Sequence, residues 1–206
     1  MPQPVFTIGH STHSIEKLAE LLTLNSVTAV ADVRSSPYSR MNPQFNRDGL
    51  EAALQESGVS YVFLGRELGA RPKDRSCYAE GKARYDLIAQ SALFQEGLDR
   101  IALGVATHRV ALLCAEKDPL ICHRAILVCR QLAVRGIDAH HILETGQIET
   151  HEQALTRLLT ELKLPDRDLF RDREEIVEDA YRRRAERIAY SEHLPLPTES
   201  ESEDWS

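Results

Sequence analysis

Residues 109–114 read RVALLC, which is the clearest buried strand in the sequence. Five apolar residues follow the arginine without a polar interruption, and such a run is typical of a strand covered on both faces in a parallel sheet. A helix is expected from about residue 121 to 134, because Pro119 stands before it and Gly136 can end it. A buried strand followed by a short loop and a helix predicts one unit of an α/β protein.

The same alternation extends in both directions along the chain. Short apolar or β-branched runs predict further strands, and Ser14, a good N-cap residue, begins the first helix. Asp48 can cap the second helix, and Gly58 can end it. We expect strands at residues 5–8, 27–33, 59–64 and 138–143, helices at 15–24, 49–57 and 85–103, and loops at 35–45 and 65–82.

Strands that alternate with helices imply right-handed parallel crossovers. The predicted fold class is therefore α/β: a Rossmann-like three-layer sandwich with a mainly parallel sheet, plus a helical C-terminal extension. In such sheets, ligands bind outside the carboxyl ends of the strands. We divide the chain into an α/β domain at residues 1–146, a helical extension at 147–190 and an acidic, disordered tail at 191–206.

The composition is that of an ordinary globular protein, with 42% hydrophobic and 28% charged residues. The net charge of -7 disfavours nucleic-acid binding by the whole surface, although a local basic pocket stays open. No apolar run approaches the roughly 18 residues that span a membrane, and the first ten residues do not resemble a signal peptide. Because the four cysteines are expected to be reduced, we expect a cytoplasmic protein with no membrane partner.

Polar side chains follow three of the predicted strands at the points where the strands end. The carboxyl ends of parallel strands meet at one edge of a sheet, and the amino end of the helix after residues 109–114 faces the same crevice. One pocket could therefore collect His10 and Ser11, Asp32 and Arg34, Cys114 and Glu116, and Cys122, His123 and Arg124.

Cys114 is the best candidate for a nucleophile. A thiol at a strand end, close to a helix amino terminus and to arginine and histidine, is in a setting that lowers a cysteine pKa. The alternative is that Cys114 simply completes an apolar strand, since cysteine is among the most buried residue types. Cys122 could be a resolving thiol, a second ligand or a packing residue.

A metal site is the less favoured interpretation of the same residues. The set His10, Cys114, Cys122 and His123 could ligate zinc in principle. Its spacing lacks the paired short intervals of structural zinc sites. We therefore expect no metal ligand and no cofactor, and keep zinc as an alternative.

Anion recognition would fall to arginine, whose guanidinium group binds phosphate or carboxylate in a bidentate manner. Arg34 and Arg124 are favoured because each lies at the predicted ligand edge of the sheet. Asp32 could orient one of them, carry a proton or brace the loop. The full set of candidates is Arg34, Arg40, Arg66, Arg71 and Arg124.

Six short motifs occur in the order and spacing of a known family. They are GHS at residues 9–11, DVR at 32–34, P-x-S-R at 37–40, LG at 68–69, C-x-E at 114–116 and CHR at 122–124. Together they resemble the domain-of-unknown-function 488 family, over about residues 5–143. The resemblance implies a Rossmann-like α/β fold and a shared polar pocket, and it supplies no established reaction. The sequence departs from the family pattern at Ala70, where a second glycine is expected after the LG pair.

These residues favour a thiol-dependent enzyme that acts on a small anionic substrate, either phosphate-like or nucleotide-like. Position 120 is leucine, so the chain lacks the Cys-x5-Arg cradle of phosphatases and rhodaneses. The catalytic candidates are Cys114, His10, His123, Asp32 and Glu116, and the substrate-binding candidates are Ser11, Arg34, Ser39, Arg40, Cys122 and Arg124.

Two other functions stay open. A binding module could hold a nucleotide, an anion or a nucleic-acid end in the same pocket without turning it over. Alternatively, the polar residues could form a structural network that braces the long loops. The helices at residues 147–190 could also bind a partner or a second copy of the chain.

Overall fold

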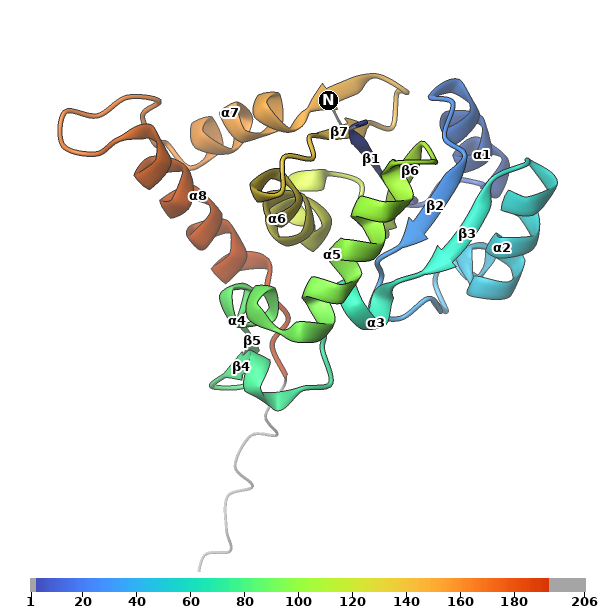
Figure 1. Ribbon diagram of the computed structural model, residues 1–206, viewed down its shortest axis with the longest axis horizontal. Coiled ribbons are helices and arrows are strands. Elements are labelled where there is room, and N and C mark those ends of the chain that lie inside the picture. Colours follow the sequence, from blue (N-terminus) through green and yellow to red (C-terminus); the bar gives the residue numbers. More distant parts are fainter. Residues whose placement is uncertain (1–2, 193–206) are drawn as a thin grey trace, which may run out of the picture.

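The computed structural model describes residues 3–192 and is built around one six-stranded sheet (Figure 1). The strand order is β3-β2-β6-β1-β7-β8; the first five strands run parallel and β8 runs antiparallel beside β7. The predicted, mainly parallel sheet is thus confirmed. The strands are β1 (Val5–Gly9), β2 (Ala29–Asp32), β3 (Ser60–Phe63), β6 (Val110–Cys114), β7 (Ala139–Ile142) and β8 (Ile148–Thr150).

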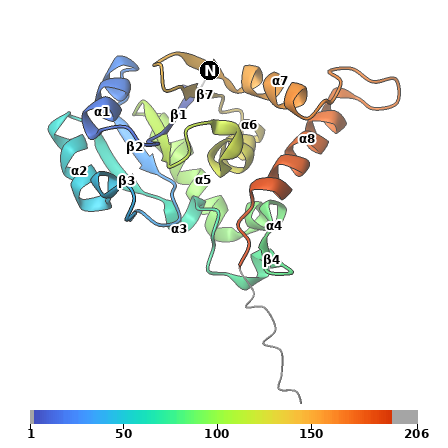
Figure 2. The ribbon, with the colours of Figure 1, turned by 180° about the vertical axis from the view of Figure 1, so that it is seen from behind.

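Helices cover both faces of the sheet, which confirms the predicted three-layer sandwich (Figures 1 and 2). One helical layer packs on the face that carries Phe6 and Leu113, and the other packs on the face that carries Val5 and Cys114. The first layer consists of α1 (Ile15–Leu24) and α2 (Arg47–Glu56), and the second contains α5 (Ala92–Val105), the π-helix η4 (Arg124–Cys129) and α6 (Arg130–Val134).

Two further helices pack on the second layer. They are α7 (His151–Glu161) and α8 (Arg173–Ile188), and they contribute Leu158 and Ile176 to the same buried core. Strand β8, which no sequence pattern indicated, brings the residues before α7 into the sheet. The tail expected at residues 191–206 lies outside the described residues from position 193 onward. No helix among residues 3–192 is both long and apolar enough to cross a membrane.

Ser91 interrupts the helix expected at residues 85–103. Its hydroxyl accepts a hydrogen bond from the Phe94 N–H, so α4 (Tyr85–Gln90) ends here and α5 begins with its own cap. The prediction of one continuous helix was therefore wrong. The helical spacing of apolar residues continues across the break, and the break itself is produced by one capping residue, Ser91.

Several expected loops and helix starts contain short elements instead. The loop expected at residues 65–82 holds a helical turn and a hairpin, and the helix expected from residue 121 begins at Arg124 as the π-helix η4, after a separate 3-10 turn. Asn46, rather than Asp48, is the N-cap of α2. The short elements are η1 (Pro43–Phe45), α3 (Gly65–Leu68), η2 (Arg75–Cys77), β4 (Tyr78–Ala79), β5 (Lys82–Ala83) and η3 (Pro119–Ile121).

Strand β6 lies between β1 and β2, although it comes much later in the sequence. In the Rossmann dinucleotide-binding order the first two strands are direct neighbours, so the strand order differs here. The register aligns Gly9 with Cys114 and Asp32 with Leu113. The three strand ends that carry the predicted polar residues are therefore adjacent.

Gly9 allows the loop after β6 to pass closely over the end of β1. A Cβ atom at position 9 would lie 1.9 Å from the carbonyl oxygen of Glu116, where no side chain fits. Next to it, the His10 N–H donates to the carbonyl oxygen of Cys114 at 2.9 Å. The glycine of the GHS motif therefore has a steric role, because it sets the path of the loop that carries Glu116.

Gly9→Ala should destabilise the protein by about 1–3 kcal/mol, because the added methyl group must push backbone atoms apart. Gly49→Ala is the matched control: a Cβ atom there meets nothing within 4 Å, and alanine is favoured over glycine in a helix by about 1 kcal/mol. Urea unfolding of both variants measures the two effects. Unchanged stability of Gly9→Ala would contradict the steric role.

Candidate functional site

A cavity of about 290 Å³ opens at the carboxyl ends of β1, β2 and β6. Six of the sequence-predicted site residues line it: His10, Arg34, Ser39, Cys114, Glu116 and His123. The rest of the lining is Ser35, Ser36, Tyr38, Asn42, Ala70, Arg71, Tyr85, Ala115, Ile121, Ile188 and Tyr190. The fold thus brings together most, but not all, of the residues expected at the site.

Cys114 ends β6 and lines the cavity, although the residue is only 3% exposed. The thiol donates a hydrogen bond to Oε2 of Glu116, with an S···O distance of 3.0 Å. Nδ1 of His123 lies 3.8 Å from the same sulfur. Cys114 therefore has a carboxyl group and an imidazole within reach.

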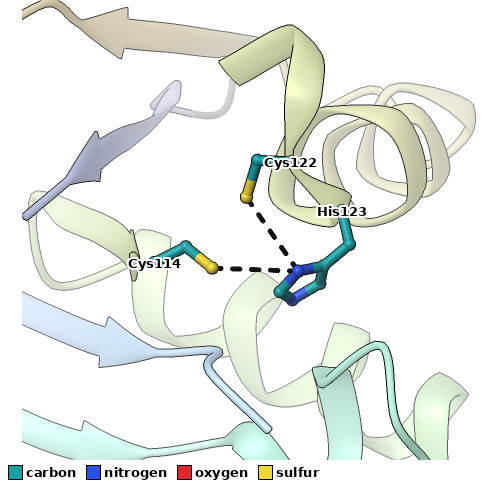
Figure 3. Close-up of side chains that lie close together, drawn as sticks. All are labelled: Cys114, Cys122 and His123. Atoms are coloured by element: carbon teal, nitrogen blue, oxygen red, sulfur yellow. Dashed lines mark hydrogen bonds between the residues drawn. The ribbon is translucent and has the colours of Figure 1, made fainter. Parts of the chain in front are cut away.

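His123 directs one ring nitrogen toward the sulfur atoms of Cys114 and Cys122 (Figure 3). Its Nε2 lies 3.0 Å from the carbonyl oxygen of Val33, which can only accept a hydrogen bond, so Nε2 carries a proton. The other ring nitrogen, Nδ1, faces the Sγ atoms of Cys114 and Cys122 at 3.8 and 3.9 Å. These three ligand atoms lie within 4.8 Å of one another, and all three residues are buried.

The two thiols of this cluster differ in acidity. Burial raises the pKa of Cys122, but the Cys114 thiol and the charges of Arg124 and His123 outweigh burial and lower that pKa well below its ordinary value. The proximity of Cys122, together with burial, raises the pKa of Cys114. The positive charges of Arg124 and His123 thus act mainly on Cys122, and the direction of the pKa shift at Cys114 is opposite to the one expected from the sequence.

The pKa values of Glu116 and His123, which lie beside Cys114, are also shifted. Burial raises the pKa of Glu116, and the charge of Cys122 raises it further. Burial lowers the pKa of His123, but its hydrogen bond to Cys122 and the Cys122 charge outweigh this effect, so the pKa of His123 is raised. The cluster thus pairs a ring that readily carries positive charge with a carboxyl group that readily accepts a proton.

Arg34 is fixed on one side by Asp32 and faces the cavity on the other. Its Nε and Nη2 donate to the two carboxylate oxygens of Asp32 at 2.9 and 2.6 Å, and Nη2 also donates to the Phe45 carbonyl oxygen at 2.9 Å. The hydroxyl of Tyr61, which the sequence analysis did not single out, donates to the same carboxylate at 2.8 Å. Asp32 itself lies behind Arg34 and is not part of the cavity wall.

His10 lines the cavity as a neutral ring. Its Nδ1 donates to the Ser11 carbonyl oxygen at 2.9 Å, which leaves Nε2 to accept from Nη1 of Arg34 at 3.3 Å. Burial lowers the pKa of His10 to about 4. These contacts favour a role in positioning Arg34 over the acid or base role expected from the sequence.

Four other sequence-predicted residues lie outside the cavity wall. Ser11 turns the chain with a φ of 47°, and its backbone rather than its hydroxyl bonds to the surrounding loops. Arg40 is exposed to solvent away from the cavity. Cys122 lies behind Cys114, and Arg124 is fully buried.

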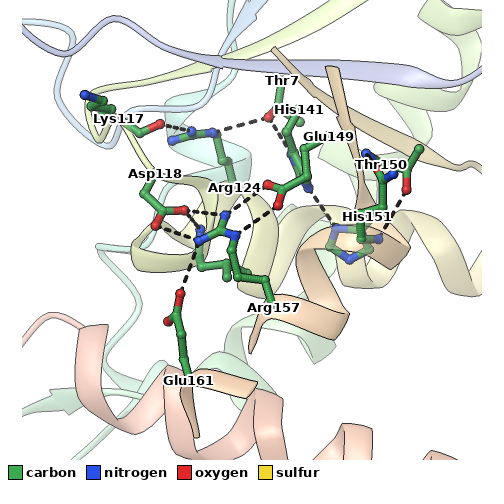
Figure 4. Close-up of polar contacts among 12 residues, drawn as sticks. Thr7, Lys117, Asp118, Arg124, His141, Glu149, Thr150, His151, Arg157 and Glu161 are labelled. Carbon is green, nitrogen blue, oxygen red and sulfur yellow. Dashed lines mark hydrogen bonds and ion pairs between the residues drawn. The ribbon is translucent and has the colours of Figure 1, made fainter. Parts of the chain in front are cut away.

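Arg124 braces the loop after β6 from inside the protein (Figure 4). Its Nη1 donates to the Glu116 carbonyl oxygen at 2.7 Å, and its Nη2 donates to the Lys117 carbonyl oxygen at 3.0 Å. Its Nε donates to the Thr7 hydroxyl at 3.4 Å. The guanidinium group is thus bonded to protein atoms, and it does not serve as the anion clamp that the sequence suggested.

A chain of hydrogen bonds continues from Arg124 to α8. Because arginine only donates, the Thr7 hydroxyl can pass its own proton toward Nδ1 of His141 at 2.8 Å. His141 Nε2 then bonds Nδ1 of His151 at 3.0 Å, and His151 Nε2 bonds the Tyr181 hydroxyl at 2.8 Å. Burial lowers the pKa of both histidines, that of His151 to about 4. No sequence motif marks these histidines.

The end of α8 and the residues after it close one side of the cavity. Ile188 and Tyr190 line the wall, and the guanidinium group of Arg71 lies 4.5 Å from the centre of the Tyr190 ring. The Ala83 N–H donates to the Tyr190 carbonyl oxygen at 2.8 Å and holds this segment in place. Arg71 is one of the arginine candidates from the sequence, whereas no sequence signal marks Tyr190, which lies far from the motifs.

A family model for the domain of unknown function DUF488 matches residues 14–130. The chain belongs to the DUF488 family. The match covers Asp32, Arg34, Cys114 and the CHR motif, and it confirms the resemblance inferred from the motifs. In this DUF488 protein, His10 and the α8 side of the cavity lie outside the matched residues. No curated protein and no solved structure matches the chain significantly.

Acid should destabilise this DUF488 protein as the pH falls from about 6.5 toward 4. The folded state keeps His10 and His151 neutral down to a pKa of about 4, whereas the unfolded chain protonates them near 6.5. The stabilisation that comes from keeping these histidines neutral is therefore fully present above pH 6.5. It is lost as the pH falls toward 4, by up to roughly 3 kcal/mol in the free energy of unfolding for each histidine. Urea unfolding across this pH range measures the loss.

His151→Gln should make this pH dependence shallower, because it removes one of the buried histidines whose pKa is lowered, which are His10, His141 and His151. His108→Gln, which removes an exposed histidine, is the matched control and should leave the slope unchanged. An unaltered slope in His151→Gln would show that this histidine titrates normally in the folded protein.

Proposed function

We propose that this protein is an enzyme that binds a small anionic substrate, phosphate-like or nucleotide-like, and reacts with it through the sulfur of Cys114. The observation that carries the proposal is that Cys114 lines the cavity while its thiol donates to the Glu116 carboxyl group at 3.0 Å. A thiol becomes a nucleophile when a neighbouring base can take its proton. Glu116 is placed to be that base.

Two arginines support an anionic substrate. Arg34 is oriented by Asp32 and His10 and lines the cavity with one N–H of its Nη1 left unbonded by the residues that the structure describes, and Arg71 also lines the cavity, beside Tyr190. Three serines of the loop at residues 35–39 add hydroxyl donors. A cavity of about 290 Å³ is at the small end of the range for ligand sites, which favours a small substrate.

The proposed reaction begins with attack by Cys114. Its Sγ forms a bond to the electrophilic centre of the substrate, and the thiol proton passes to Glu116. The leaving group departs with the electron pair of the broken bond and receives the proton back from Glu116. His123, whose Nδ1 lies 3.8 Å from the sulfur, stabilises the negative charge that develops there.

The alternative proposal is a binding module that holds a nucleotide, an anion or a nucleic-acid end without reaction. It rests on the same arginines and needs no reactive thiol; the net charge of -7 argues against nucleic acid as the main ligand. For either function we propose the cytoplasm, because the four cysteines are unpaired. The expected association through residues 147–190 stays a prediction; Leu169 and Phe170, 94% and 92% exposed, are the apolar pair that would support it.

Iodoacetamide should modify Cys114 in folded, metal-free protein at least about tenfold faster than Cys129, which is 0% exposed. Inorganic phosphate or AMP should slow the modification by occupying the cavity. Glu116→Gln should slow it by about tenfold or more, because an amide cannot take the thiol proton. Peptide mass spectrometry over time measures each rate.

If Cys114 reacts only after unfolding, the thiol mechanism fails. Should phosphate still raise the melting temperature in that case, the binding module becomes the better function. With neither thiol reactivity nor ligand binding, the polar residues would be a structural network alone.

Arg71→Gln should weaken binding of phosphate or AMP by about tenfold, which corresponds to about 1.4 kcal/mol. Its matched control is Arg66→Gln, because Arg66 is an exposed arginine on the same segment that does not line the cavity. Calorimetric titration of both variants gives the two affinities. Equal affinities would remove Arg71 from the site while leaving the reactivity of Cys114 unaffected.

A further inference from the structure

We infer that Cys114, Cys122 and His123 form a binding site for one Zn²⁺ ion. The inference goes beyond the proposed function, which uses the Cys114 sulfur as a nucleophile and involves no metal. It rests on how the three ligand atoms lie relative to one another, on what surrounds them and on the open side of the cluster.

The spacing of the ligand atoms is close to that of a tetrahedral zinc centre. With Zn–S bonds of about 2.3 Å and Zn–N bonds of about 2.0 Å, a tetrahedron has S···N edges of about 3.5 Å and an S···S edge of about 3.8 Å. Here Nδ1 of His123 lies 3.8 and 3.9 Å from the two sulfurs, and all three atoms lie within 4.8 Å of one another. Shifts of a few tenths of an ångström in these side chains would place the three ligand atoms at three corners of a tetrahedron around the ion.

The surroundings orient these ligands as metal sites require. The proton on Nε2 of His123 is fixed by the Val33 carbonyl oxygen at 3.0 Å, so the ring presents its other nitrogen to the sulfurs. A hydrogen bond of this kind on the second ring nitrogen is the usual partner of a metal-bound histidine. The Arg124 backbone N–H also donates to the Cys122 sulfur at 3.4 Å.

The chemistry of the ligand set favours zinc. Thiolate and imidazole are soft or borderline donors that select zinc over magnesium and calcium. Two thiolates, each having released its proton, would balance the two positive charges of the ion inside a cluster whose residues are all at least nine-tenths buried. His10, the fourth member of the zinc set considered from the sequence, does not join, because its Nε2 faces Arg34 instead.

The fourth corner of the tetrahedron faces the cavity. Cys114 and His123 both line the cavity wall, and Glu116 lies beside Cys114 at 3.0 Å. A water molecule, an anion or the Glu116 carboxylate can therefore complete the coordination, as in zinc sites with three protein ligands. Zinc would withdraw negative charge from the Cys114 sulfur that binds it, so the metal would make the proposed nucleophile less reactive.

The test adds Zn²⁺ to the full-length, chelator-treated protein and measures retention against a chromophoric chelator. We expect one zinc per chain with a Kd of about 1 nM or below, a thiolate-to-metal charge-transfer band when Co²⁺ replaces zinc, and alkylation of Cys114 slowed at least about tenfold. Cys122→Ser and His123→Gln should each weaken binding by at least about 100-fold. Cys129→Ala, on the same π-helix but outside the cluster, should bind zinc like the wild type.

Three results would overturn the inference: no zinc retained by the wild type, zinc retained equally by the Cys122 and His123 variants, or unchanged Cys114 alkylation in the zinc-loaded protein. None of them touches the proposed function, which is tested by the reactivity of Cys114 in metal-free protein. Conversely, an inert Cys114 in protein that binds zinc tightly would remove the thiol mechanism and leave the metal site standing.

Discussion

A guanidinium group enclosed in a protein core must place its N–H groups on hydrogen-bond acceptors, since an unpaired buried charge costs several kcal/mol. Arg124 is such a group: it is 0% exposed and bonds the carbonyl oxygens of Glu116 and Lys117 and the Thr7 hydroxyl. These acceptors come from the loop after β6 and from β1. Arg124 therefore ties the π-helix to strand β1 and to the loop after β6. These hydrogen bonds help to hold Glu116 beside Cys114.

The start of the π-helix explains how two consecutive residues, Cys122 and His123, reach the same point. Consecutive side chains of a regular helix point about 100° apart. Cys122 instead has extended backbone, with φ -129° and ψ 140°, and His123 is the first helical residue, with φ -60° and ψ -25°. This change of conformation lets both side chains converge on Cys114. Irregular helices of this type are frequent at functional sites.

Much of the fold could be predicted from local pattern, because buried parallel strands appear as apolar runs and capping residues mark helix starts. The strand ends carrying His10, Arg34 and Cys114 could be expected at one edge for the same reason. What local pattern could not show was the insertion of β6 between β1 and β2, the break of the helix after residue 121, or the orientation of Arg124. Each depends on contacts between residues about 80 or more positions apart or on a backbone change at one residue, and neither leaves a periodic signal.

The residues that line the cavity come from two distant parts of the chain. Cys114, Glu116 and His123 lie within the residues matched by the family, whereas Ile188 and Tyr190, which line one side of the cavity, lie beyond them. The segment that carries Tyr190 is held against the hairpin of β4 and β5 and the turn before it: the Ala83 N–H donates to the Tyr190 carbonyl oxygen, and Arg75 forms an ion pair with Glu192. The sheet and the start of the π-helix therefore position Cys114 and its polar neighbours, while contacts with a hairpin about a hundred positions earlier position the wall beside them.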